Sequence, residues 1–111
     1  MAIKKETQQK IQELQLCEQS LQQLLMQKQA FQMELTDTEN ALSEISKTKE
    51  DVFKMIGQIM VKTDKKQLEK DLKQKQELLS LRMKSIERQE TELTKQLEET
   101  RDEVMREMKE K

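Results

Sequence analysis

The chain has 111 residues, 39% of them charged, with 21 Lys and Arg residues against 22 Asp and Glu residues and a net charge of −1. This balance argues against nucleic acid as a partner, because phosphate binding needs an excess of basic side chains. With 33% hydrophobic residues, 2% aromatic residues and no Trp or Tyr, the chain cannot build a large compact core. Two structural classes then remain possible, a disordered chain or long helices that each bury a narrow stripe. The many Gln, Glu, Lys, Leu and Met residues have high helix propensity and favour helices.

The first predicted element is a helix from about residue 3 to residue 46. Apolar residues recur every seven positions in two rows, which mark the a and d positions of a coiled coil. The rows are Leu14, Leu21, Lys28, Leu35 and Leu42, and Cys17, Leu24, Phe31, Thr38 and Ile45. Cys17 is the only cysteine. It cannot form an internal disulfide, which fits a small seam residue in a reducing, cytoplasmic setting.

A segment of another kind follows the first helix, and we expect it to form a β-hairpin over about residues 50–63. Gly57, the only Gly of the chain, precedes Gln58, and this pair suits a two-residue type II′ turn. The alternative is a single helix that continues through Gly57. It is disfavoured because the heptad pattern is lost between Ile45 and Leu68.

The predicted hairpin carries apolar side chains on both faces, and its edges are open to further pairing. One face can sit on the helix bases of its own chain, and the other needs cover from outside. Because a lone hairpin is marginal in water, we expect it to complete its sheet with other subunits. The expected assembly residues are Val52, Phe53, Met55, Ile56, Gly57, Ile59, Met60 and Val61.

The second predicted helix runs from about residue 65 to residue 109, after a capping box formed by Asp64 and Gln67. One of its rows is apolar and the other is partly polar. The rows are Leu72, Leu79, Ile86, Leu93 and Thr100, and Glu69, Gln76, Met83, Glu90, Leu97 and Val104. Helices of equal length on either side of a tight turn predict a mainly α, single-domain antiparallel coiled coil. Lys28 and Glu90, polar residues on the seam, either extend to its edge or set its pairing and register.

Several kinds of site are not expected. The chain has no His, no Gly-rich phosphate loop and no metal-ligand spacing, so we expect no enzyme, catalytic residue, cofactor or metal. No apolar run approaches the roughly 20 residues that span a bilayer, and the first residues lack the apolar core of a signal peptide. A membrane-surface helix is disfavoured because the charged face is balanced in sign. We therefore expect a cytoplasmic protein with no membrane or nucleic-acid partner.

The hairpin segment, residues 52–63, reads Val-Phe-Lys-Met-Ile-Gly-Gln-Ile-Met-Val-Lys-Thr and resembles the signature of prefoldin β-type subunits. Residues 27–36 and 86–90 are similar to the archaeal β subunit, and the resemblance covers about residues 11–100. It implies a hexamer of two α-type and four β-type subunits whose hairpins join into β-barrels. It also implies an ATP-independent chaperone that binds unfolded polypeptides at the coiled-coil tips and delivers them to a group II chaperonin.

A surface that binds varied unfolded chains should be apolar and adaptable, and methionine suits that task. Ile3, Val104, Met105 and Met108 lie at the free ends of the two helices. We expect these four to form the client-binding patch, with several tips acting together by avidity. The plain alternative is that Met105 and Met108 are ordinary exposed helix residues. The rival function is a structural coiled-coil adaptor that oligomerises through its hairpin.

Overall fold

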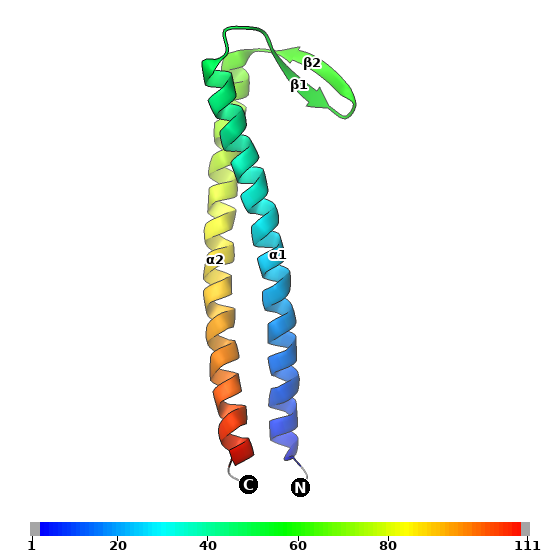
Figure 1. The fold of residues 1–111 in the computed structure, drawn as a ribbon, viewed down its shortest axis with the longest axis vertical. Coiled ribbons are helices and arrows are strands. Elements are labelled where there is room, and N and C mark those ends of the chain that lie inside the picture. The colour runs from blue at the N-terminus through cyan, green and yellow to red at the C-terminus, as the bar shows by residue number, and fades with distance from the viewer. Residues whose placement is uncertain (1–2, 110–111) are drawn as a thin grey trace. The chain divides into compact units, whose positions relative to one another are not determined.

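The computed structural model describes residues 3–109 as two long helices joined by a β-hairpin (Figure 1). The elements are α1 (Lys5–Lys47), β1 (Val52–Ile56), β2 (Ile59–Thr63) and α2 (Lys65–Lys109). The expected mainly α architecture, helix then hairpin then helix, is confirmed. The chain divides into two compact units. The terminal unit holds residues 3–29 and 84–109, and the hairpin unit holds residues 30–83.

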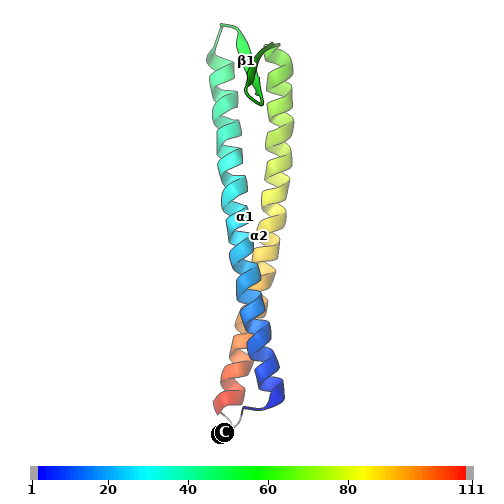
Figure 2. The same cartoon turned by 90° about the vertical axis from the view of Figure 1, so that its right-hand side faces the viewer.

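In the terminal unit, the first half of α1 and the second half of α2 lie side by side and run in opposite directions (Figure 2). Leu24 and Ile86 are buried between them. The Cys17 thiol is half-buried and donates to the carbonyl oxygen of Leu93 over 3.4 Å, as suits a small seam residue. The predicted rows therefore form the seam of this unit, because a spacing of seven keeps the same helix face toward the partner.

In the hairpin unit, the end of α1 packs against the start of α2. Leu79 and Met83 of α2 are buried there. Thr38 of α1 is also buried, and its hydroxyl donates to the carbonyl of Glu34, one turn earlier, over 2.8 Å. That bond satisfies the hydroxyl within its own helix, so a polar residue can occupy the seam.

The hairpin has the expected two-residue turn at Gly57-Gln58. Gly57 has a φ of 62°, and no other residue in the described range 3–109 has a positive φ. Positive φ at the first central position only is the type II′ pattern, which needs Gly there. The turn closes the antiparallel pair at Ile56 and Ile59, and the register runs to Val52 opposite Thr63.

The start of α2 only partly matches the expected capping box. The backbone N–H of Gln67 lies 3.4 Å from the Asp64 carboxylate, as in the box. The side chain of Gln67, however, donates to Asp71 over 2.9 Å instead of reaching back to residue 64. Asp71 lies one turn further along the helix, so Gln67 finds an acceptor without bending back. Asp64 alone serves as the N-cap.

Candidate functional site

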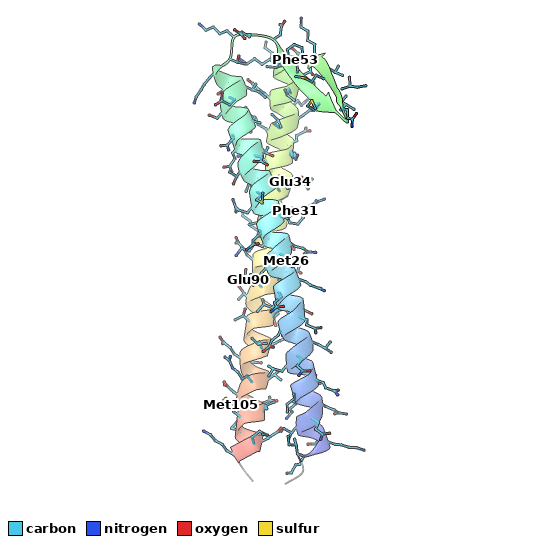
Figure 3. All side chains as sticks on the ribbon, turned by 45° about the vertical axis from the view of Figure 1, so that its right-hand side comes forward. Met26, Phe31, Glu34, Phe53, Glu90 and Met105 are labelled. Carbon is cyan, nitrogen blue, oxygen red and sulfur yellow. The ribbon has the colours of Figure 1, made fainter. Side chains whose placement is uncertain are left out.

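The hairpin exposes apolar side chains on both of its faces. Directly opposed residues share a face, so the register separates the two sets. One face holds Val52, Ile56, Ile59 and Val61 with Lys54 and Thr63, and the other holds Phe53, Met55 and Met60 with Lys62. Six large apolar side chains of the hairpin are between 42% and 67% exposed, and Phe53 stands among them in Figure 3.

The expectation that one hairpin face rests on the helix bases is wrong. Only Val52 and Thr63, at the base of the hairpin, are half-buried, and every residue between them is exposed. Figure 1 shows the strands projecting to the side of the helices of this unit. β2 passes into α2 through Asp64 alone, and at this point the strand pair leaves the helices to one side, so neither face lies on the helix bases. Both faces are therefore open to a partner.

The hairpin also offers two open edges. Among the described residues, β1 pairs only with β2, so each strand has one edge whose backbone groups bond no other strand. Such edges are templates for added strands. The base of the hairpin is fastened by the Lys62–Asp51 ion pair at 3.3 Å, and by Lys65, whose ammonium donates to the carbonyl of Thr48 over 2.9 Å.

At the other candidate site, in the terminal unit, a polar cluster joins the ends of the two helices. The Thr7 hydroxyl, in a residue only 1% exposed, donates to Glu107 over 2.9 Å. The Lys10 ammonium donates to the other oxygen of the same carboxylate over 2.5 Å and lies 3.4 Å from Glu103. We call Thr7, Lys10, Glu103 and Glu107 the clasp.

The clasp shifts the titration of its members. The hydrogen bond from Lys10, and then that from Thr7, lowers the pKa of Glu107 below its ordinary value of 4.5. The hydrogen bond with Glu107 raises the pKa of Lys10 above its ordinary value of 10.5, although desolvation acts in the opposite direction. Both groups are therefore held in their charged forms.

Sequence reasoning did not identify the clasp. Thr7 and Lys10 continue the α1 rows one heptad before Leu14 and Cys17, and Glu107 continues the α2 rows three residues beyond Val104. The signal was therefore present, because extending the rows places all three residues on the seam. No apolar residue marks the seam at these three positions, so the apolar pattern alone does not extend the rows to them.

The four residues expected to bind clients all lie in the terminal unit, beside the clasp. Ile3 precedes α1 and is half-buried, and Val104 is half-buried on the seam. Met105 and Met108 lie off the seam and are 54% and 47% exposed, and Figure 3 shows Met105 near the end of α2. The exposed side chains of Met105 and Met108 therefore lie in the same unit as the clasp, near the end of α2.

The described residues hold no group of three or more residues able to bind a metal ion. Within residues 3–109, neither helix has a stretch long and apolar enough to cross a membrane. The candidate surfaces are the exposed faces of the hairpin and the helix ends of the terminal unit.

Comparisons with known proteins agree on one family. The family model described as a prefoldin subunit matches residues 8–111. A prefoldin subunit beta of Thermococcus onnurineus is 43% identical over 84 residues, which cover 74% of this chain and 72% of the relative. The prefoldin subunit beta of Pyrobaculum arsenaticum is 39% identical over 90 residues, which cover 79% of this chain and 73% of that relative. The crystal structure of the prefoldin beta subunit from Thermococcus strain KS-1 matches with a TM-score of 0.84 at 35% identity, covering 93% of this chain and 92% of that chain.

Proposed function

The chain belongs to the prefoldin family as a β-type subunit, and from that premise we propose that it is one subunit of an ATP-independent holdase. The family is one of chaperones and not of enzymes. In the proposal, the protein works in the cytoplasm, captures unfolded polypeptides at the free ends of its helices and delivers them to a group II chaperonin. Its assembly partner is an α-type subunit, with two α and four β subunits in the complex.

The observation that carries the assembly is the hairpin with two apolar, exposed faces. Full burial of a large apolar side chain contributes about 1.5–3 kcal/mol. Six such residues are roughly half covered within the chain, so covering the rest would contribute on the order of 1 kcal/mol each. The sum is comparable with the cost of association, about 4–15 kcal/mol. Added hydrogen bonds along the open edges of β1 and β2 would support a barrel shared by several subunits.

The client-binding part of the proposal rests on the terminal unit. Met105 and Met108 are unbranched, exposed and placed beside Val104 and Ile3. A patch this small binds weakly, and weak binding at one tip is useful when several tips act on one client. Linked sites of this kind gain a factor of about 10²–10⁴ in overall affinity without any new contact.

The decisive experiment is co-expression with an α-type subunit followed by native mass spectrometry. We expect a complex of two α and four β chains that, without nucleotide, suppresses aggregation of chemically denatured citrate synthase on dilution. A stable monomer under these conditions would contradict the assembly. A complex that gave no protection but bound one folded partner with saturation would support the structural adaptor instead.

A further inference from the structure

One side of α1 in the terminal unit carries no charged residue from Gln8 to Gln29. This side consists of the ten positions that point away from the seam, and all ten residues are exposed. They are Gln8, Gln9, Gln12, Gln15, Leu16, Gln19, Gln22, Gln23, Met26 and Gln29. We call these ten residues the glutamine face. Figure 3 shows Met26 on α1 within this unit.

The charges of this stretch of α1 lie elsewhere on the helix. Lys10 and Lys28 are on the seam, where they pair with Glu107 and Glu90. The acidic residues Glu13 and Glu18 flank the seam. The absence of charge is thus confined to the outward side of α1, so it reflects one helix face and not the whole segment.

The outward side of α2 in the same unit has the opposite character. Nine of its twelve residues are charged, and the other three are Ser85, Thr91 and Met105. The charged ones are Lys84, Arg88, Glu92, Lys95, Glu98, Glu99, Asp102, Arg106 and Lys109. The outward face of a helix needs only polar side chains that water can solvate, and on α2 these are charged residues of both signs. Solvation therefore does not explain why α1 uses neutral side chains.

We propose that the glutamine face is a second contact surface for unfolded polypeptide, separate from the patch at the helix ends. The inference rests on the proposed chaperone function and names the part of the client that is bound, its backbone. A Gln amide both donates and accepts hydrogen bonds, as a peptide group does. An unfolded chain exposes peptide groups without internal partners, and the exposed Leu16 and Met26 would contact its apolar side chains.

The lack of charge suits this occupant better than any fixed partner. Unfolded clients share a backbone but no pattern of charge, so a charged face would repel some of them and would need ions to be desolvated. Burying a Gln amide against a peptide group costs little, because each satisfies the other. From Gln8 to Gln29 the face extends about 32 Å at 1.5 Å per residue. An extended client would cover it with about ten residues.

A folded neighbour is a poorer fit to the glutamine face. Stable interfaces bury about 800 Å² on each partner around an apolar core. Only Leu16 and Met26, which are 64% and 71% exposed, are large and apolar among its ten residues. Weak, reversible contact with a mobile chain is consistent with so few apolar residues.

The test places charge on the glutamine face without touching the seam. The variant is Gln12→Glu, Gln19→Glu and Gln29→Glu, in which each new carboxylate has only uncharged residues three and four positions away. Gln and Glu have similar helix propensity, so the helix should be preserved. The matched control is Lys84→Gln, Lys95→Gln and Lys109→Gln, which makes the same change in net charge on the outward side of α2. A further variant, Leu16→Gln with Met26→Gln, removes the apolar side chains and adds no charge.

Each variant is assembled with an α-type subunit, and binding of fluorescently labelled, reduced and carboxymethylated lysozyme is followed by anisotropy. We expect the Kd to rise at least 5-fold for the triple Glu variant, about 3-fold for the Leu16 and Met26 variant, and less than 2-fold for the control. Circular dichroism and native mass confirm equal folding and assembly.

Equal Kd values for the unchanged complex and both glutamine-face variants would overturn this inference and leave the chaperone function standing. Loss of subunits from the triple Glu complex would also overturn it, since the face would then be covered by a neighbouring subunit. Failure of the unchanged complex to bind the probe would overturn the inference together with the proposed function.

Discussion

Lys28 of α1 and Glu90 of α2 face each other across the seam of the terminal unit, with the ammonium nitrogen 2.9 Å from the carboxylate. Both residues occupy seam positions where an apolar side chain would pack better, and each leaves about a third of its side chain exposed. The hydrogen bond with Glu90 raises the pKa of Lys28, against a desolvation that lowers it. A shift of one heptad would place Lys28 opposite Met83 or Leu97. The pair therefore favours this register over its neighbours.

Reversing one charge of this pair should destabilise the coiled coil, and reversing both should restore it. We expect Glu90→Lys to lower the Tm by several degrees, because two ammonium groups would then share the seam. Lys28→Glu combined with Glu90→Lys should recover most of that loss. Circular dichroism melts of Lys28→Glu, Glu90→Lys and the double variant measure the effect. A double variant no more stable than either single one would show that the pair does not set the register.

The clasp should make the helix ends sensitive to acid. The folded-state pKa of Glu107 lies below its ordinary value of 4.5, so its contribution is present above about pH 4.5 and is lost as the pH falls through the folded value. The raised pKa of Lys10 gives a contribution that is present below 10.5 and lost as the pH rises beyond it. The neighbouring charges are Lys4, Glu103 and Arg106.

Glu107→Gln isolates the acid side of this effect. The variant should have a lower Tm than the unchanged chain at pH 7, and the difference should shrink between pH 4.5 and pH 3. Thermal melts at fixed ionic strength across this range provide the measurement, and Glu98→Gln, on the outward side of α2, is the control. A constant difference at all pH values would mean that the Glu107 charge has no role.

Replacing Gly57 with a residue that has a Cβ atom should weaken assembly of the complex. A Cβ at this position would meet nothing within 4 Å, so the cost of Gly57→Ala comes from its φ of 62° and not from a clash. Such backbone strain costs about 1–3 kcal/mol. Gln58→Ala, at the other turn position, where φ is not positive, is the matched control. Native mass spectrometry should show more dissociated chain for the first variant only; equal dissociation would argue against the turn as the cause.

Leu79 and Leu81, two residues apart on α2, should differ strongly in their effect on stability. Leu79 is 3% exposed and Leu81 is 63% exposed. Leu79→Ala should cost about 2–4 kcal/mol through lost burial and the cavity it leaves. Leu81→Ala should change stability by less than about 0.5 kcal/mol. Urea unfolding of both variants tests this difference, and similar losses would place the seam elsewhere on α2.

Met105 and Met108 should affect client binding and leave stability unchanged. Replacing both with Gln keeps the helix propensity and removes the exposed apolar surface. We expect weaker suppression of citrate synthase aggregation, by roughly 2- to 5-fold per complex, because several tips lose contact together. Leu81→Gln, a similarly exposed residue of the hairpin unit, is the control. Full protection by the double variant would remove these two residues from the proposed patch.

Much of the fold follows from local rules that the sequence carries alone. The spacing of seven placed Leu24, Leu79 and Ile86 on the seam, and all three are buried. Gly57 before Gln58 located the turn, because a type II′ turn needs positive φ at its first position. These features depend on residues a few positions apart, so periodicity and turn chemistry are sufficient to predict them.

The pairs that join distant parts of the chain were decided only in three dimensions. The spacing of residues within each helix does not predict that Lys28 faces Glu90. It also does not predict that Thr7 and Lys10 both bind the carboxylate of Glu107. The same heptad rows are compatible with several registers, and the choice depends on which side chains oppose each other after folding. The hairpin shows the same division. Its strands follow from sequence, but the openness of both faces depends on the direction in which the hairpin leaves the helices, which no local pattern of residues determines.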